Sequence, residues 1–300
     1  MSVTVITDSV ATIPAELAAD LRIVVVPERL TLGDETYVDG QLSLEEVVAR
    51  IDEGFTTSGP SPGDFVEAIE QHGSDDGVLI VTVARELASS TFDAAHVAAR
   101  MINQRVNVHD SRTAAGAQGL IVLGAARLAR DGRPLEEVTS EAFYIGDRVR
   151  LVARLDDLNW LARGGHVPYL AARAGDMVGV KPIVEVRHGR VHTLRPALSL
   201  EGASERLLDI WRSSDPGDAR LHIAGLHALG EETAAELLDA VRAVVTPASD
   251  FIGHFGTVMV MHSGPGLTGL AWWWDERQLL VTSNSLGRAQ SQHPVDCLTD

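Results

Sequence analysis

The first half of the 300-residue chain alternates between strand-like and helix-like segments, and this order restricts the possible folds more than any other feature. Segments rich in β-branched residues lie at 2–9, 22–30, 77–83 and 105–111, and helix-like segments lie at 14–21, 43–55, 62–72, 88–102 and 114–132. Alternation of this kind indicates an α/β fold, in which a mostly parallel sheet is covered by helices.

The pattern changes near residue 150. A turn at His188-Gly189 joins two strand-like segments, which is typical of a hairpin. Further strands are expected at 219–226 and 257–261, and helices at 201–213 and 231–244. We therefore predict two α/β domains, 1–149 and 150–274, the second with a mixed sheet, followed by a polar C-terminal tail at 275–300.

Composition excludes several classes of function. The chain has 25 basic and 42 acidic residues, a net charge of −17, which argues against a large surface for nucleic acid or anionic membrane. It contains no stretch of apolar residues long enough for a membrane span. The single cysteine, Cys297, and an N-terminus without a secretory signal favour a cytoplasmic location.

Residues 59–63 read Gly-Pro-Ser-Pro-Gly, which matches the G-x-S-x-G pattern of hydrolase nucleophiles. That motif requires a strand before the serine, whereas the apolar spacing at 43–55 predicts a helix there. Ser61 precedes Pro62 and lies three residues before Asp64, so we interpret it as the N-cap of the next helix.

Polar side chains cluster where the predicted strands end. These clusters are Thr7-Asp8-Ser9, Ser89-Ser90-Thr91, Asp110-Ser111 and His262-Ser263, and Thr57-Ser58 is expected close by. Ligands of parallel sheets bind at this edge. The alternative reading is structural, with Ser89 as an N-cap, Asp8 and Asp110 as loop caps, and His262 as a turn residue.

Hydroxyl groups and helix N-termini dominate these clusters, and cations are few. Such groups suit a single carboxylate held by charge-assisted hydrogen bonds. The aliphatic residues of the chain suit a long acyl tail. The histidines show no metal-binding spacing, and neither a Walker loop nor G-x-G-x-x-G occurs, so no metal and no cofactor is expected.

Eight short segments in order resemble the DegV family of bacterial fatty-acid-binding proteins. The segments are ITDSVATIP, VVPERL with YVDG, TTSGPS, LASSTFDAA, HDSRTAAGAQG, LNWLARGGHV, VKPIVEV and MHSGPGLTG. The resemblance implies a long-chain fatty acid, such as palmitate, buried between two domains. It also implies that the protein is a carrier and not an enzyme, and that a separate ATP-binding fatty acid kinase subunit acts on the presented acid.

The resemblance assigns the carboxylate to Thr57, Ser58 and Ser89, with His262 near the headgroup. Ser90 and Ser263 are further candidates, and Arg195 is the nearest match to an arginine linked to exchange with the kinase. The chain departs from the family pattern at Gly59, where a glutamine is usual, at Ser90, where a glycine is usual, and at His166, where an arginine is usual.

Two other functions remain open from the residues. The first is a serine hydrolase that uses Ser61 or Ser89 with His262 as base, since this order of residues is permitted. The second is a phosphoryl- or sugar-binding enzyme in which His262 acts covalently.

Overall fold

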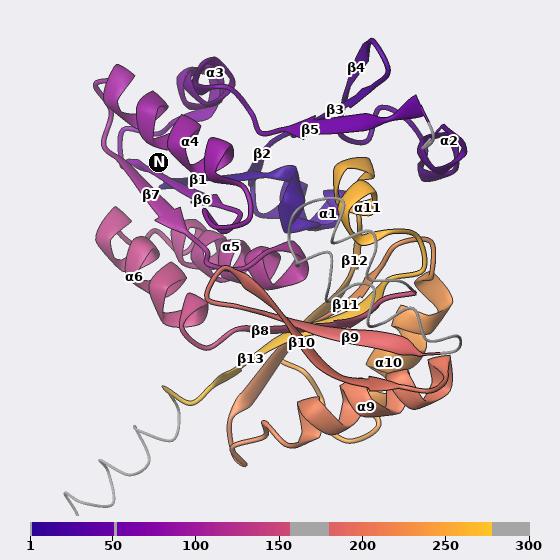
Figure 1. Ribbon diagram of the computed structural model, residues 1–300. Coiled ribbons are helices and arrows are strands. Elements are labelled where there is room, and N and C mark those ends of the chain that lie inside the picture. Colours follow the sequence, from indigo (N-terminus) through magenta and orange to yellow (C-terminus); the bar gives the residue numbers. More distant parts are fainter. Residues whose placement is uncertain (1, 51–52, 157–179, 278–300) are drawn as a thin grey trace, which may run out of the picture.

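The computed structural model describes residues 2–50, 53–156 and 180–277 and has an α/β fold built in layers. A four-stranded sheet and a six-stranded sheet are separated by a layer of helices, and further helices cover the outer face of each sheet (Figure 1). A small three-stranded sheet extends from one side. The predicted fold class is confirmed.

The four-stranded sheet is entirely parallel, in the order β2-β1-β6-β7. Its strands are β1 (Thr4–Asp8), β2 (Val24–Val26), β6 (Val78–Thr82) and β7 (Val106–Asp110). Ile6 and Ile80 pack against the outer helices α3 (Pro62–His72) and α4 (Ser89–Met101). Val5 and Leu79 face the other way, toward the helices between the sheets, so alternate residues serve the two faces.

The six-stranded sheet is mixed, in the order β10-β9-β8-β13-β11-β12. Its strands are β8 (Arg150–Arg154), β9 (Lys181–Arg187), β10 (Arg190–Ala197), β11 (Arg220–His227), β12 (Ser249–His254) and β13 (Thr268–Asp275). Helices α9 (Leu200–Arg212) and α10 (Glu231–Arg242) cover its outer face, where Trp211 and Trp272 are buried. The predicted hairpin at His188-Gly189 joins β9 to β10.

Helix α5 (Ala115–Arg130) lies between the two sheets, beside α6 (Leu135–Gly146). A Cβ atom at Gly116 would lie 2.6 Å from Leu226 of β11, and one at Gly119 would lie 2.5 Å from the carbonyl oxygen of Ala11. Glycine is therefore needed at both positions for α5 to approach its two neighbours. One apolar core runs through this layer into both sheets.

The three-stranded sheet packs against α11 (Thr257–Ser263), a short helix that is distant from it in the sequence. Its strands are β3 (Arg29–Leu32), β4 (Glu35–Val38) and β5 (Phe55–Ser58), with α2 (Leu44–Ala49) beside them. Val258 and Met261 of α11 (Thr257–Ser263) pack against Leu30 and Leu32. Asp39 accepts hydrogen bonds from Thr257 Oγ1 and Val258 N, at 2.9 and 3.1 Å, and so caps α11.

Two predicted elements end earlier than their patterns suggested. The strand predicted at 22–30 is two strands, β2 and β3, because Pro27 interrupts the run and β3 pairs with a different sheet. The helix predicted at 43–55 ends at Ala49, and Phe55–Ser58 forms β5 because it pairs with β3. A strand therefore does precede Ser61, contrary to the prediction.

The strand predicted at 257–261 is also wrong, because these residues begin α11. The β-branched spacing favoured a strand, but burial against β3 and the cap from Asp39 favour a helix. The helix predicted at 14–21 is confirmed as the short helix α1 (Ala15–Asp20). Elements that were not predicted are α6, β4, β8, β12, β13 and the short segment η1 (Ser9–Ala11).

The domain boundary between 149 and 150 stays a prediction. It is supported by the fact that the described strands up to residue 110 form the four-stranded and three-stranded sheets, whereas those from 150 onward form the six-stranded sheet. The predicted tail lies outside the described residues from 278 onward, as does His166.

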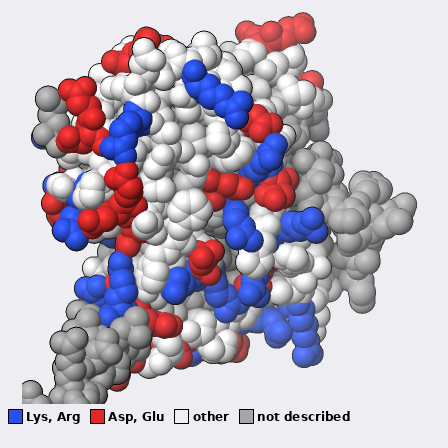
Figure 2. All heavy atoms as spheres, turned by 90° about the vertical axis from the view of Figure 1, so that its left-hand side faces the viewer, with Lys and Arg blue, Asp and Glu red and all other residues white. Residues whose placement is uncertain are grey.

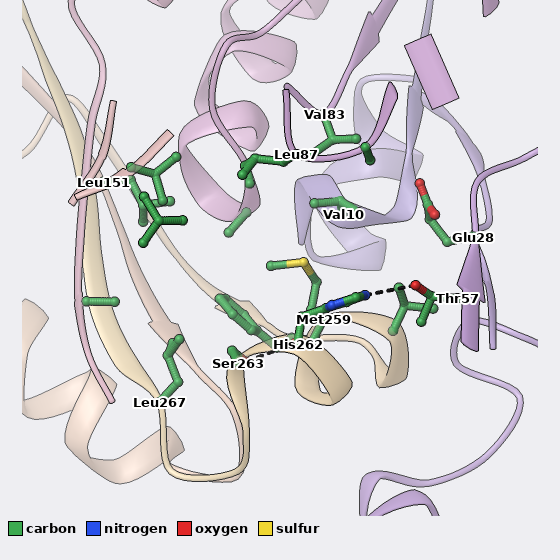
Figure 3. A pocket seen from close by; sticks show the side chains of 18 of the residues that line it. Val10, Glu28, Thr57, Val83, Leu87, Leu151, Met259, His262, Ser263 and Leu267 are labelled. Carbon is green, nitrogen blue, oxygen red and sulfur yellow. Dashed lines mark hydrogen bonds between the residues drawn. The ribbon is translucent and has the colours of Figure 1, made fainter. Parts of the chain in front are cut away.

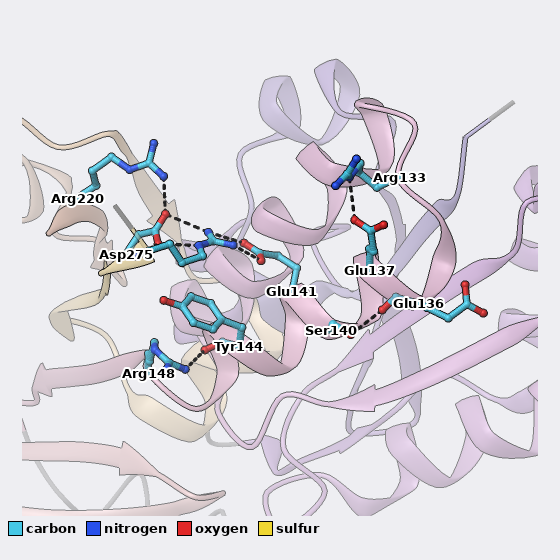
Figure 4. Close-up of polar contacts among 10 residues, drawn as sticks. Arg133, Glu136, Glu137, Ser140, Glu141, Tyr144, Arg148, Arg220 and Asp275 are labelled. Atoms are coloured by element: carbon cyan, nitrogen blue, oxygen red, sulfur yellow. Dashed lines mark hydrogen bonds and ion pairs between the residues drawn. The ribbon is translucent and has the colours of Figure 1, made fainter. Parts of the chain in front are cut away.

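An ion-pair network connects α6 to the end of β13 (Figure 4). Arg277 binds Glu141 on α6 at 2.6 Å and Asp275 at 2.7 Å, and Arg220 binds the second oxygen of Asp275. Burial alone would raise the pKa of the Asp275 carboxyl, but the hydrogen bonds from Arg277 and Arg220 hold it at about 2. These contacts join the inter-sheet helix layer to the six-stranded sheet.

Charged side chains of both signs are interspersed on the face of the molecule that Figure 2 shows. Several of the arginines in the described residues pair with neighbouring carboxylates, such as Arg133 with Glu137 at 2.8 Å. This pattern on the visible face agrees with the argument from net charge against a large basic surface.

Candidate functional site

A cavity of about 390 Å³ lies between the four-stranded and six-stranded sheets. Its walls are mostly aliphatic, and its size falls within the usual range for small-molecule sites. Val10, Val83, Leu87 and Ala114 line it from the segments that follow strands β1, β6 and β7. The six-stranded sheet and its adjoining residues contribute Leu151, Ala153, Leu155, Val184, Val186, Val191 and Leu267. Figure 3 shows these apolar side chains around an open space.

Polar side chains gather at one end of the cavity. They come from the end of β5, the start of α4, the end of α11 and the connection from β2 to β3. In Figure 3 Glu28, Thr57 and His262 lie together on the right, opposite Leu151 and Leu267. The cavity is therefore amphipathic, with one hydrophilic end and one long aliphatic part.

Thr57 and His262 form the contact that closes this polar end. Thr57 Oγ1 and His262 Nε2 lie 2.8 Å apart. Thr57 is positioned because it pairs with Leu30 in the β3–β5 ladder. His262 is positioned because α11 is packed on the same small sheet and capped by Asp39. The structure thus brings two predicted site residues together through one shared structural unit.

Ser89 and Ser90 are the first two residues of α4 and both line the cavity. The N-cap position is Ala88, and it makes no side-chain capping bond, so the alternative reading of Ser89 as an N-cap is wrong. A helix N-terminus carries partial positive charge and free N–H groups. The start of α4 therefore places two hydroxyl groups and a favourable dipole at the polar end.

Other predicted residues take different positions. Ser58 lines the cavity, as does Ser263, whose hydroxyl donates to the Met259 carbonyl at 2.9 Å. Arg195 is an exposed residue of β10 and is not among the residues that line the cavity. Ser61 lies outside the lining and is the N-cap of α3, as predicted, within a capping box completed by Asp64.

The remaining clusters at strand ends are structural. Asp8 accepts hydrogen bonds from Val10 N and Val83 N, and Asp110 accepts from Arg85 N and Arg112 N. Among the described residues no group of three potential metal ligands occurs. In the same part of the chain no helix is long and apolar enough to cross a membrane.

Glu28 is a cavity residue that the sequence analysis missed. Its side chain is only 4% exposed, and Thr91 Oγ1 donates to its Oε1 at 2.9 Å. Burial, together with the nearby carboxylate of Asp8, raises the pKa of Glu28 to about 8. The predicted strand ran to residue 30, whereas β2 ends at Val26. With the correct strand end, the rule that ligand-binding groups follow the ends of parallel strands would have identified Glu28.

Comparisons with known proteins agree with this geometry. The family model described as an uncharacterised protein of the DegV family matches residues 2–274. The chain belongs to the DegV family. A DegV domain-containing protein of Streptomyces coelicolor is 32% identical over 275 residues, which covers 89% of this chain and 97% of that protein.

Two solved DegV structures show the same fold. The chain matches a DegV family protein from Thermus thermophilus, described by its fatty acid binding, with a TM-score of 0.83 and 29% identity, over 91% of this chain and 100% of that one. DegV from Bacillus subtilis, described as a fatty acid binding protein, matches with a TM-score of 0.80 and 28% identity, over 92% and 100%. The resemblance inferred from the eight segments is confirmed.

Proposed function

We propose that this protein binds one long-chain fatty acid in the cavity between the sheets. The observation that carries the proposal is the amphipathic cavity, aliphatic along its length and hydroxyl-lined where Thr57 meets His262. Thr57, Ser58 and Ser89 hold the carboxylate, and Ser90 adds a further hydroxyl. DegV relatives of known structure that are described as fatty acid binding proteins support this assignment.

The energetics favour a long tail. Burial of about 14 methylenes at ~0.8 kcal/mol each contributes on the order of 11 kcal/mol before costs. Association and ordering cost several kcal/mol, which still leaves tight binding. A carboxylate at the polar end gains charge-assisted hydrogen bonds from hydroxyls and the start of α4.

The protein acts as a carrier that presents the bound acid to a separate ATP-binding kinase subunit. The sequence has no Walker loop and no G-x-G-x-x-G, and the 2.8 Å contact of His262 Nε2 is with the hydroxyl of Thr57, a proposed carboxylate ligand. The carrier alone, mixed with ATP and fatty acid, is expected to form no acyl-phosphate. Formation by the purified single chain would contradict the carrier role.

Calorimetry on the delipidated protein tests ligand binding. We expect one molecule of myristic, palmitic or stearic acid per chain, with a negative heat-capacity change from apolar burial. A fluorophosphonate probe tests the hydrolase alternative in the same preparation. Labelling that disappears in Ser89→Ala, together with no binding of the three acids, would favour the hydrolase.

A further inference from the structure

Glu28 stands out in the cavity because it places an acidic group where an anionic headgroup is expected. It lines the polar end with Thr57 and Ser89, and Figure 3 shows its carboxyl facing the space above Thr57. A carboxylate beside a second carboxylate in a buried site is strongly unfavourable unless one of them is protonated. The position of Glu28 therefore requires an explanation if the cavity binds a fatty acid.

The hydrogen bonds around Glu28 and Asp8 show which of the two buried carboxyls keeps its charge. Asp8 accepts from three N–H groups, those of Val10, Val83 and the Gln118 side chain, at 2.8–3.1 Å. The Glu28 side chain accepts from the neutral hydroxyl of Thr91. Three donors stabilise an anion at Asp8, whereas Glu28 is better suited to a neutral acid.

The other titratable groups near Glu28 do not favour its ionisation either. The carboxylate of Asp39, which follows β4, is a second acidic group nearby. The Ser9 hydroxyl links it to Glu28, because it accepts from the Glu28 backbone N–H and donates to the Asp39 carboxylate. Arg29 is the next residue in the chain, but its guanidinium forms two hydrogen bonds with Asp64. His262 lies across the polar end and contacts Thr57. The raised pKa of Glu28, about 8, agrees with this arrangement.

The absence of a side chain at Gly59 leaves room for the hydrogen bond between Thr91 and Glu28. A Cβ atom at Gly59 would collide with the Thr91 hydroxyl, which donates to Glu28. The departure from the family pattern at this position therefore creates the room in which Thr91 and Glu28 meet. A glutamine at residue 59 would displace the Thr91 side chain.

We propose that Glu28 is a headgroup-binding residue that carries a proton and donates a hydrogen bond to the fatty acid carboxylate. This inference rests on the proposed function and adds a specificity determinant to it. The loaded cavity then contains one proton shared between two carboxyl groups, which satisfies both without a cation. Binding above the pKa of free Glu28 must therefore take up a proton, and affinity falls as the solution becomes more alkaline.

A matched set of variants tests the role of Glu28. Wild type, Glu28→Gln and the control Glu70→Gln, an exposed residue of α3, are titrated with palmitate near pH 7 and pH 9. Glu28→Gln keeps a neutral donor and an acceptor for Thr91. We expect the Kd of wild type and Glu70→Gln to rise about tenfold from pH 7 to pH 9, while that of Glu28→Gln changes less than about twofold.

Ionisation of palmitate affects the Kd of all three proteins equally, so the difference between wild type and Glu28→Gln reports only the effect of Glu28. If the Kd of Glu28→Gln for palmitate rises from pH 7 to pH 9 as much as that of wild type, the proposal is overturned. It is also overturned if folded Glu28→Gln binds no palmitate at either pH. If no protein, wild type included, binds near pH 7, the proposed function fails instead.

A second measurement needs no variant. Wild-type calorimetry in two buffers of different ionisation enthalpy gives the number of protons taken up on binding. We expect nearly one proton near pH 9 and nearly none near pH 7. Absence of proton uptake near pH 9 would overturn the role of Glu28 while leaving fatty acid binding in place.

Discussion

Thr57 Oγ1 and His262 Nε2 lie 2.8 Å apart, although 205 residues separate them in the sequence. The contact exists because β5 and α11 both belong to the unit around the three-stranded sheet. Asp39 fixes this unit by capping α11 from the first part of the chain. The positions of Thr57 and His262 at the headgroup end of the cavity are therefore determined by tertiary contacts with residues distant in the sequence.

His262 is expected to orient the Thr57 hydroxyl. His262→Gln keeps a nitrogen that can reach Thr57, so it should retain most of the affinity for palmitate. His262→Ala removes the partner and should weaken binding by about 1–2 kcal/mol, the scale of one buried hydrogen bond. Calorimetry measures the affinity, and urea unfolding serves as the stability control. Equal binding by wild type and both variants would make His262 purely structural.

Ser89 and Thr57 are expected to hold the carboxylate directly. Ser89→Ala and Thr57→Ala should each weaken palmitate binding by roughly 1.5–3 kcal/mol, as for hydrogen bonds to a charged group. Ser140→Ala is the matched control, since the Ser140 hydroxyl donates to the Glu136 carbonyl on α6, away from the cavity (Figure 4). Wild-type affinity in Ser89→Ala would remove this residue from the headgroup site.

Ser61 should affect stability but not binding. Its hydroxyl accepts from Asp64 N at 3.2 Å, and the Asp64 side chain binds the Ser61 backbone N–H in return. Ser61→Ala should lower the free energy of unfolding by about 1 kcal/mol, the usual cost of a lost N-cap. Denaturant unfolding at constant pH measures this loss. A variant with unchanged unfolding and no ligand binding would restore Ser61 as a functional residue.

His109 makes the fold sensitive to acid. This residue of β7 is only 3% exposed, its ring packs edge-on against Phe143, and burial lowers its pKa to about 4. An unfolded histidine has a pKa near 6.5, so the unfolded state binds the extra proton and stability falls as the pH drops from about 6.5 to about 4. The loss is about 3 kcal/mol for this residue. His109→Leu should flatten that part of the stability profile in urea unfolding; an unchanged profile would contradict the assignment.

Local patterns predicted the parts of the fold in which sequence and tertiary environment agree. Apart from the segments at 22–30 and 43–55, the alternation up to Gly132 was correct, as were the hairpin at His188-Gly189 and the cap at Ser61, because short-range periodicity and turn chemistry determine them. The segment at 257–261 was wrong because burial against β3 and a cap from Asp39, residues more than 200 positions away, decide its conformation.

The candidate site was predicted in part for the same reason. Thr57, Ser58, Ser89 and His262 all line the cavity, whereas Arg195 lies elsewhere on β10. Glu28 was missed because the strand appeared to run through Pro27, which hid the end of β2. The role of Gly59 depends on its close approach to Thr91 of α4, a contact with the residue just after β5 that no local pattern contains.

The ligand carried by the protein tests the central claim most directly. The purified protein is analysed by native mass spectrometry, followed by organic extraction and identification of the released lipid. The account predicts one long-chain fatty acid per chain, and a delipidated protein that binds it again with one-to-one stoichiometry. A protein that carries no lipid, and that binds no fatty acid after delipidation, would contradict it.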